Sequence, residues 1–252
     1  MSFLGPNSIT RFTPVVSQYV KYRPSYPAQL FKFLEQNLCM CCNVAELGAG
    51  TGIFSRQLAL EFPELKIIAV EPNDHMRKAA ELEPRENIIF HNGTAEDTGL
   101  PSQYVEAVLA AQAFHWFHPE RTLKEIERIS KPGSFCCAVW NDRNSTPKSF
   151  NAKLEEILSD LCSSYRTMRK PHHTILDLHK LVPSGKEVFF PHKERHDLKG
   201  LIGRMASTSY VAQENGSTQE KINVELRKAF EVHETNGYVT IDYHTKVFYW
   251  ST

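Results

Sequence analysis

One acidic residue and three glycines at alternate positions follow one another in a short stretch of the sequence and could together hold a nucleoside. The stretch reads Glu46-Leu47-Gly48-Ala49-Gly50-Thr51-Gly52 and continues an apolar run that is typical of a strand. Glycines let the backbone approach a ligand closely, and the helix expected over residues 53–62 would point its free N–H groups at that ligand. A dinucleotide fingerprint would place its third glycine at position 53, which is Ile53. The spacing therefore favours a nucleoside cofactor that is not a dinucleotide.

Polar residues also follow three later apolar runs, each of which predicts a strand. The run at residues 66–70 is followed by Glu71, 23 positions after Gly48, and an acid there can accept hydrogen bonds from both hydroxyls of a ribose. The next two runs precede the stretch Thr94-Ala95-Glu96 and the stretch from Gln112 to Phe117. Because the carboxyl ends of parallel strands share one edge of a sheet, these polar residues are expected to surround a single ligand.

The Glu-x-Gly-x-Gly-x-Gly pattern resembles motif I of the class I S-adenosylmethionine-dependent methyltransferases. In that family the loop carries the amino-acid end of the cofactor, and the acid before it, here Glu46, helps to bind the ammonium group through ordered water. The resemblance implies that Glu71 holds the ribose, that residues 94–96 cup the adenine, and that residues 112–117 lie beside the sulfonium and the methyl group. The cofactor-binding residues implied in this way are Tyr22, Arg23, Glu46, Gly48, Ala49, Gly50, Gly52, Glu71, Pro72, Met76, Thr94, Ala95, Glu96, Ala111, Gln112 and Phe117.

Two further stretches sharpen the resemblance. Tyr22-Arg23-Pro24-Ser25-Tyr26-Pro27, before the glycines, and His115-Trp116-Phe117, after the fourth strand, look like the methyltransferase subgroup that includes the trans-aconitate methyltransferases. The match in motif content runs from about Tyr19 to Trp140. Resemblance of this kind identifies the cofactor far better than it identifies the acceptor.

The chemistry expected of such a site is modest. A methyl group on a sulfonium is already activated, so the protein mainly aligns the acceptor for in-line attack and excludes water. A carboxylate acceptor, which we favour, is ionised at neutral pH and needs no general base. An amine, phenol or thiol would use one, and His115 is then the best placed candidate. The residues expected to bind the acceptor are Tyr19, His115, Trp116, Trp140, Arg204 and Tyr210, and those expected to position the reacting groups are Tyr19, Arg23 and His115.

The elements that must position these residues read as one α/β domain. Five near-continuous apolar strands separated by helical stretches predict a parallel sheet covered on both faces. With a long closing strand over residues 238–249 that runs antiparallel, as the resemblance implies, the expected fold is a doubly wound, Rossmann-like sheet of seven strands with helical cap insertions. We expect a single domain, 1–252, made of an N-terminal helical cap (1–38), a cofactor-binding half (39–147), a helical insertion (148–186) and a C-terminal sheet half (187–252).

Local signals are weaker in the second half of the chain. Apolar residues at helical spacing predict helices over residues 149–165 and 198–210, whereas residues 166–186 read as a loop with at most one helical turn. A Ser-x-x-Glu capping box from Ser217 to Glu220 predicts the start of another helix, which Gly237 would end.

Composition limits the classes of partner. The 252 residues contain 29 Lys and Arg against 29 Asp and Glu, and the zero net charge argues against a nucleic acid. No apolar run approaches the roughly 18 residues that span a bilayer, and the start of the sequence lacks a signal-peptide pattern, so we expect no membrane partner and a cytoplasmic location. The cluster at Cys39, Cys41 and Cys42 lacks a second pair at metal-ligand spacing, so we expect reduced thiols and no metal. The sequence leaves the oligomeric state open.

Two other functions stay open at this point. A regulator or partner subunit that binds S-adenosylmethionine without turnover would share the cofactor loops, although it need not keep Glu46, Glu71 and the His115-Trp116 loop together. A methyltransferase acting on RNA or protein is disfavoured by the neutral charge and by the absence of an Asn-Pro-Pro-Tyr type signature after the fourth strand.

Overall fold

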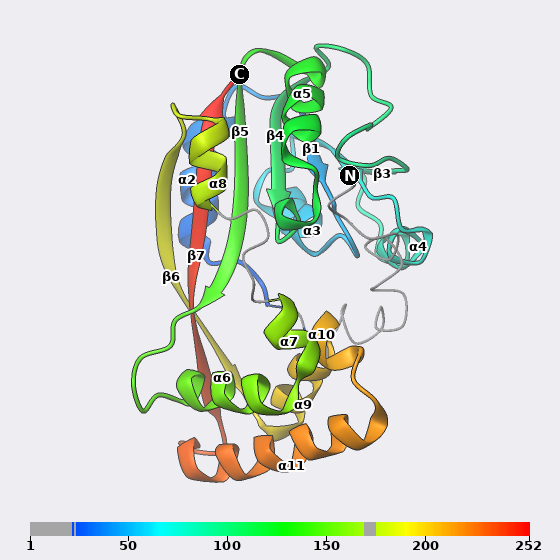
Figure 1. The fold of residues 1–252 in the computed structure, drawn as a ribbon. Coiled ribbons are helices and arrows are strands. Elements are labelled where there is room, and N and C mark those ends of the chain that lie inside the picture. Colours follow the sequence, from blue (N-terminus) through cyan, green and yellow to red (C-terminus); the bar gives the residue numbers. More distant parts are fainter. Residues whose placement is uncertain (1–21, 23, 169–174) are drawn as a thin grey trace.

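A single seven-stranded sheet forms the centre of the computed structural model, which describes residue 22, residues 24–168 and residues 175–252 (Figure 1). The strand order is β3-β2-β1-β4-β5-β7-β6; the first five strands of the chain are parallel, and β7 lies antiparallel between β5 and β6. This arrangement confirms the expected doubly wound α/β fold. The strands are β1 (Asn43–Leu47), β2 (Lys66–Val70), β3 (Ile88–His91), β4 (Val105–Ala111), β5 (Ser130–Arg143), β6 (Lys186–His196) and β7 (Val239–Ser251).

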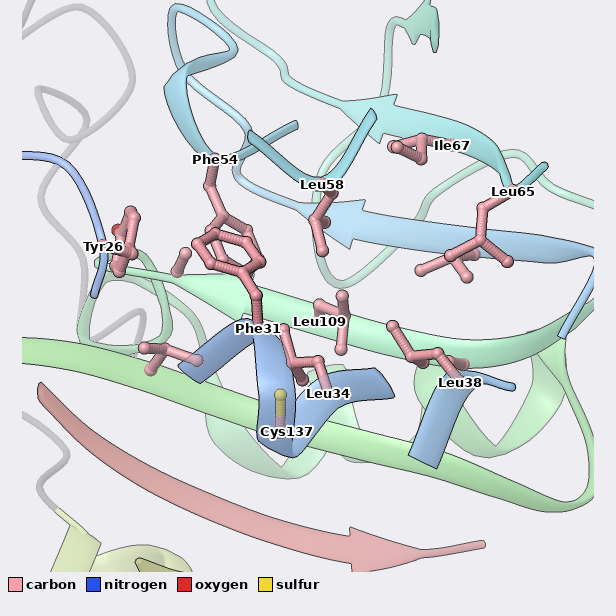
Figure 2. Close-up of a cluster of buried hydrophobic side chains, with 14 of the residues drawn as sticks. Tyr26, Phe31, Leu34, Leu38, Phe54, Leu58, Leu65, Ile67, Leu109 and Cys137 are labelled. Carbon is pink, nitrogen blue, oxygen red and sulfur yellow. The ribbon is translucent and has the colours of Figure 1, made fainter. Parts of the chain in front are cut away.

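Helices cover both faces of the sheet. On one face, α2 (Ala28–Leu38) and α3 (Ile53–Glu61) pack together, and Phe31 and Phe54 lie over Leu109 of β4 (Figure 2). On the other face, α5 (Pro119–Ile129) and α8 (Ile175–Leu181) pack against the alternate residues of the same strands. Because β4 is buried from both sides, it is apolar at nearly every position, as the sequence indicated. Helix α4 (Asp74–Glu81) lies beside β3.

The strands β5, β7 and β6 extend beyond the other four and carry a helical cap at that end (Figure 1). The cap has a hydrophobic cluster of its own, in which Leu154, Leu201 and Leu226 are fully buried. One insertion, between β5 and β6, and a second, between β6 and β7, both contribute to it. The cap helices are α6 (Phe150–Leu161), α7 (Ser163–Met168), α9 (Leu198–Ala206), α10 (Ser209–Ala212) and α11 (Gly216–His233).

Three segments of the chain lie in other parts of the fold, or have another structure, than the sequence predicted. Residues 28–38 form α2, whose residues Leu30 and Leu34 are fully buried against the sheet, so this helix belongs to the core layer rather than to a cap. The stretch 187–252 supplies α9, α10 and α11 to the cap as well as two strands to the sheet. Within the expected loop 166–186, residues 175–181 form α8. No helix in the described ranges is long and apolar enough to cross a membrane.

The longest cap helix does not start where the sequence predicted. Asn215 is the N-cap residue of α11, and its side-chain oxygen accepts a hydrogen bond from the Thr218 backbone N–H at 2.9 Å. The expected capping box at Ser217 is therefore wrong, because Asn215, an equally good cap, occupies the N-cap position two residues earlier. The helix also ends at His233 rather than at Gly237.

We expect replacement of the N-cap residue to destabilise the cap helix. Asn215→Ala leaves the Thr218 N–H without its acceptor and should lower the free energy of unfolding by about 1 kcal/mol. Ser217→Ala removes an exposed side chain that caps nothing and is the matched control, expected to change stability by less than about 0.5 kcal/mol. Urea unfolding of the two variants measures both values. If Ser217→Ala lost more stability than Asn215→Ala, Ser217 and not Asn215 would be the cap of this helix.

Candidate active site

A pocket opens at the carboxyl ends of β1, β2 and β4, where the strand order reverses between β1 and β4. Open α/β sheets bind their ligands at this switch point. Most of the residues that we expected to bind the cofactor line this pocket: Glu46, Gly48, Ala49, Gly50, Glu71, Pro72, Met76, Thr94, Ala95, Glu96, Ala111, Gln112 and Phe117. Trp116, which we expected to bind the acceptor, lines it as well. Six further lining residues were not named individually in the expected cofactor set, although most of them lie in the stretches that the sequence singled out: Pro24, Tyr26, Thr51, Ile53, Phe54 and Ala113.

Other expected site residues lie elsewhere. Gly52 caps the start of α3, and His115 and Trp140 lie just behind the lining residues, bonded to each other. Arg204 and Tyr210 belong to the cap, and Tyr22 packs against α9. Tyr19 and Arg23 lie outside the described residues.

The loop after β1 can hold a ligand because it has no side chains at its tightest points. Gly48 has a φ of +70°, and a Cβ built on it would lie 2.7 Å from the Cβ of Ala113 and 3.0 Å from the ring of Phe117. Gly52 has a φ of +76° and serves as the N-cap of α3, whose first turn has no side-chain cap. The N–H groups of that first turn are therefore available to a ligand in the pocket.

Glu71, at the end of β2, is a carboxylate fixed by backbone donors. Its two oxygens accept hydrogen bonds from the N–H of Gly50, at 2.8 Å, and of Asn73, at 2.9 Å. The side chain is nearly buried, and burial raises its pKa while these two bonds oppose the rise. Each carboxylate oxygen has a second lone pair, so the group can still accept the two hydroxyls of a ribose.

Glu46 is the second acid of the pocket and is almost completely buried, with 1% of its surface exposed. Burial raises its pKa from 4.5 to about 8; the hydroxyl of Ser55, which donates to Oε2, opposes this, and the charge of Glu71 adds to it. The charge of Arg56 also lowers this pKa, but no cationic side chain in the described ranges forms an ion pair with Glu46. A bound ammonium group, held through water, would supply a cationic partner and would stabilise the ionised form.

The loop after β3 closes the pocket opposite the glycines. Thr94 and Asp97 exchange two hydrogen bonds, of 3.0 and 3.1 Å, which fold residues 94–97 into a compact turn. Glu96 Oε1 accepts a hydrogen bond of 2.7 Å from the His118 N–H and so ties this turn to the start of α5. The wall formed by Thr94 and Ala95 is mostly apolar and suits a flat base.

The turn after β4 holds its residues in a strained conformation. Gln112 has a φ of +54°, which is rare for a residue with a side chain, and its N–H is bound by the carbonyl oxygen of Val139 at 2.8 Å. Such strain is often found at functional sites. A short 3-10 helix, η2 (Phe114–Trp116), follows and brings Trp116 into the pocket.

His115 is fixed by a neighbouring strand. The indole N–H of Trp140 donates to His115 Nδ1 at 3.3 Å, so the neutral imidazole carries its proton on Nε2. In this tautomer the ring offers an N–H donor rather than a basic nitrogen. The arrangement therefore suits a role in orienting an oxygen acceptor better than a role as general base.

A second polar cluster lies inside the cap and was largely missed by the sequence. Arg143, at the end of β5, donates to Glu155 at 2.7 Å, to the Tyr165 hydroxyl at 2.9 Å and to the Tyr210 hydroxyl at 3.1 Å. Burial alone would lower the pKa of Arg143, but its neighbours Tyr210 and Glu155 raise it well above its usual value. This guanidinium is permanently charged and fully partnered.

Arg204, on α9, differs from Arg143 because it has no acid bound to it. Only 4% of its surface is exposed, and its Nε and Nη1 have no hydrogen-bond partner among the described residues. Burial lowers its pKa, but Tyr243 and Tyr210 raise it overall, so it stays charged. A buried, unpaired cation costs free energy unless an anion reaches it.

A short segment separates the pocket from this cluster. We call residues Pro24–Tyr26 the strap; Pro24 and Tyr26 line the pocket. The N–H of Ser25 donates to Glu194 Oε1 of β6 at 3.1 Å, and the Ser25 carbonyl oxygen accepts from the side chain of Asn141 at 3.2 Å. Burial raises the pKa of Glu194, but His192, His196 and the charge of Arg204 bring it down to about 2, so Glu194 is ionised.

The donor set fits the cofactor that the resemblance implies. Two buried acids, a glycine-rich loop and a mostly apolar wall meet in one pocket. The acids suit the ammonium group and the ribose hydroxyls of S-adenosylmethionine, the loop suits its amino-acid end, and the apolar wall suits its base. Among the described residues no group of three His, Cys, Asp or Glu side chains could hold a metal ion, and all six cysteines are free thiols.

Comparisons with known proteins give the same picture. A family model described as a methyltransferase domain matches residues 45–138. An uncharacterized methyltransferase of Schizosaccharomyces pombe is 32% identical over 222 residues, which are 85% of each chain. An uncharacterized methyltransferase of Mycobacterium tuberculosis is 35% identical over 133 residues. This match covers about half of each protein, 53% of the present chain and 53% of its relative.

Solved structures share the fold. A candidate type II methyltransferase from Anaeromyxobacter dehalogenans has a TM-score of 0.67 and 23% identity, and the match covers 91% of this chain and 98% of that one. A phosphoethanolamine N-methyltransferase of Haemonchus contortus, solved with phosphomonomethylethanolamine and S-adenosylhomocysteine, has a TM-score of 0.56 and 12% identity over 98% of this chain and 58% of that one.

The raised pKa of Glu46 makes stability depend on pH. Between its ordinary value of 4.5 and about 8, the folded chain keeps a proton that the unfolded chain releases, so this group makes the fold less stable as pH rises. Glu46→Gln removes that dependence and keeps an acceptor for Ser55. From pH 5 to pH 8 the variant should gain stability relative to the unchanged protein by up to about 1.4 kcal/mol per pH unit. Urea unfolding across this range tests it, and a constant difference would contradict the assignment.

Proposed function

Since the chain belongs to the S-adenosylmethionine-dependent methyltransferases, we propose that it transfers the methyl group of that cofactor to a carboxylate of a small-molecule acceptor. The stretches Tyr22–Pro27 and His115–Phe117 support a relation to the trans-aconitate methyltransferase subgroup. The neutral net charge supports a small molecule rather than a nucleic acid as the partner.

Different residues of the pocket would bind different parts of the cofactor. Glu71 would accept the ribose hydroxyls, Glu46 would balance the ammonium charge, and residues 94–96 would enclose the base. S-adenosylmethionine, when bound, supplies a methyl group that is already activated by its sulfonium. The protein therefore has to orient an acceptor and exclude water, and such alignment can lower a barrier by roughly 7 kcal/mol in favourable cases.

The guanidinium of Arg204, which forms no ion pair with an acid among the described residues, is the observation that carries the choice of a carboxylate. Its buried Nε and Nη1 have no hydrogen-bond partner in the described part of the chain, whereas Arg143, in the same polar cluster, is bound to an acid and two hydroxyls. A guanidinium presents a planar fork that matches a carboxylate. An anionic acceptor entering from the side of the cap would remove the cost of that buried charge.

The residues near the methyl end of the pocket suit an acceptor that needs no base. Trp116 lines the pocket with an apolar surface that excludes water, and Nδ1 of the neighbouring His115 already accepts a hydrogen bond from the indole of Trp140. A carboxylate is already ionised at neutral pH, so orientation by hydrogen bonds is sufficient.

Calorimetric titration with S-adenosylmethionine and, separately, with NAD tests the cofactor. We expect binding of the first in the micromolar range and none of the second, because Ile53 and Glu71 suit a single nucleoside. A panel of carboxylates, amines and phenols then tests methyl transfer, with carboxylates expected to react. Cofactor binding without any methylation would favour a regulator, salt-dependent retention on RNA would favour a macromolecular acceptor, and absence of binding would refute the cofactor site.

Replacing Arg204 should separate stability from activity. Arg204→Met removes a buried unpaired charge and keeps a similar volume, so we expect an unchanged or raised melting temperature. With a carboxylate acceptor from the panel, kcat/KM should fall on the order of 100-fold. Arg143→Met is the matched control: it leaves the Glu155 carboxylate without its partner and should lower the melting temperature. Full activity of Arg204→Met would exclude the proposed anion site.

A further inference from the structure

One glycine in the cap makes room for a ring that precedes the strap. Gly203 lies inside α9 and is buried, and a Cβ built on it would lie 2.5 Å from Cε2 and Cζ of Tyr22. Real Cβ atoms do not approach a ring that closely, so any side chain at position 203 must displace Tyr22. Alanine is otherwise preferred over glycine in the interior of a helix, and Gly203 does not have a positive φ. A glycine at position 203 is therefore explained by the close packing of Tyr22 and not by an unusual backbone conformation.

Polar side chains from three different elements hold the strap. Gln57 of α3 accepts a hydrogen bond of 3.1 Å from the N–H of Tyr26. On the far side, Asn141 of β5 donates to the Ser25 carbonyl oxygen and Glu194 of β6 accepts from the Ser25 N–H. The backbone groups of Ser25 and Tyr26 are thus bound by side chains rather than by secondary structure, and the position of the strap depends on its neighbours.

The anchored strap forms part of the wall of the cofactor pocket. The ring of Tyr26 packs edge-on against Phe54 at 4.8 Å, and both residues line the pocket together with Pro24. Tyr22 is only two residues before Pro24, the first residue of the strap, so its packing on α9 limits where the strap can begin.

Gly203 and Glu194 also lie next to Arg204, the residue that we propose binds the acceptor. Gly203 immediately precedes Arg204, and Glu194, which binds the strap, lies close enough to Arg204 for that charge to affect its ionisation. A shift of α9 would therefore move both Arg204 of the proposed anion site and the surface on which Tyr22 packs.

We propose that Gly203 is a positioning residue: by leaving room for Tyr22, it seats the strap against the cofactor pocket, so that a change within the cap helix α9 alters cofactor affinity. This inference rests on the proposed function for the identity of the cofactor. It assigns a role in the cofactor site to a residue that touches neither the cofactor pocket nor the reacting atoms.

The test is calorimetric titration with S-adenosylhomocysteine, which binds without turnover. Gly203→Ala should bind it about tenfold more weakly and should melt at a moderately lower temperature, because the packing lost when Tyr22 is displaced outweighs the gain in helix propensity. Gly216→Ala is the matched control. Gly216 is also helical and has nothing within 4 Å of a built Cβ, so this variant should keep the unchanged affinity.

A double-mutant cycle distinguishes positioning through Tyr22 from a general disturbance of α9. In the Tyr22→Ala background there is no ring to displace, so adding Gly203→Ala should change affinity by less than about twofold. An equal loss in both backgrounds would overturn the proposal, as would unchanged affinity of Gly203→Ala in a protein that binds S-adenosylhomocysteine. Absence of binding by the unchanged protein would instead refute the proposed function.

If Gly203→Ala does not fold, variants of Gln57 test whether the strap supports the cofactor pocket. Gln57→Ala removes the acceptor of the Tyr26 N–H and should weaken S-adenosylhomocysteine binding severalfold, whereas Gln57→Glu keeps an acceptor at the same place and should retain most of the affinity. If Gln57→Ala binds as tightly as the unchanged protein, the strap does not support the pocket and the proposal fails.

Discussion

Close contact between the loop after β1 and the turn after β4 is the constraint on which the site depends. Gly48 lies so near Ala113 and Phe117 that a single methyl group would separate the two turns. This contact brings the ends of two parallel strands together at the place where the strand order reverses. The two acids, the base-binding turn and the strained Gln112 take their positions from it, because each lies within a few residues of a strand end.

The first half of the fold and most of the cofactor pocket could be predicted because their signals are local. Glu46 and Glu71 directly follow or end apolar strands, and the parallel register carries both to one edge of the sheet. The spacing of three glycines identifies a tight turn without knowledge of any distant contact. Pro24 and Tyr26 lie in the stretch 22–27, and Ala113 lies in the stretch 112–117, both of which the resemblance singled out, but only the structure shows which members of each stretch face the pocket.

The cap could not be predicted in the same way because its interactions join distant segments. Arg143 finds its partners 12, 22 and 67 residues further along the chain, and no periodic pattern links these positions. Arg204 was expected at the acceptor as a cation that suits a carboxylate, but only the three-dimensional structure shows that its Nε and Nη1 have no hydrogen-bond partner among the described residues. The N-cap at Asn215 shows the limit even for local signals, since two good capping residues lay two positions apart and packing selected the first.

The division of the molecule into sheet and cap has an evolutionary consequence. The cap is inserted on both sides of β6, at one edge of the sheet, and it has its own hydrophobic cluster. Substitutions and length changes can therefore accumulate there without disturbing the glycine loop at the centre. New acceptor preferences can arise in such a lineage while the cofactor stays the same, and the strap is the point at which each altered cap must remain compatible with an unchanged core.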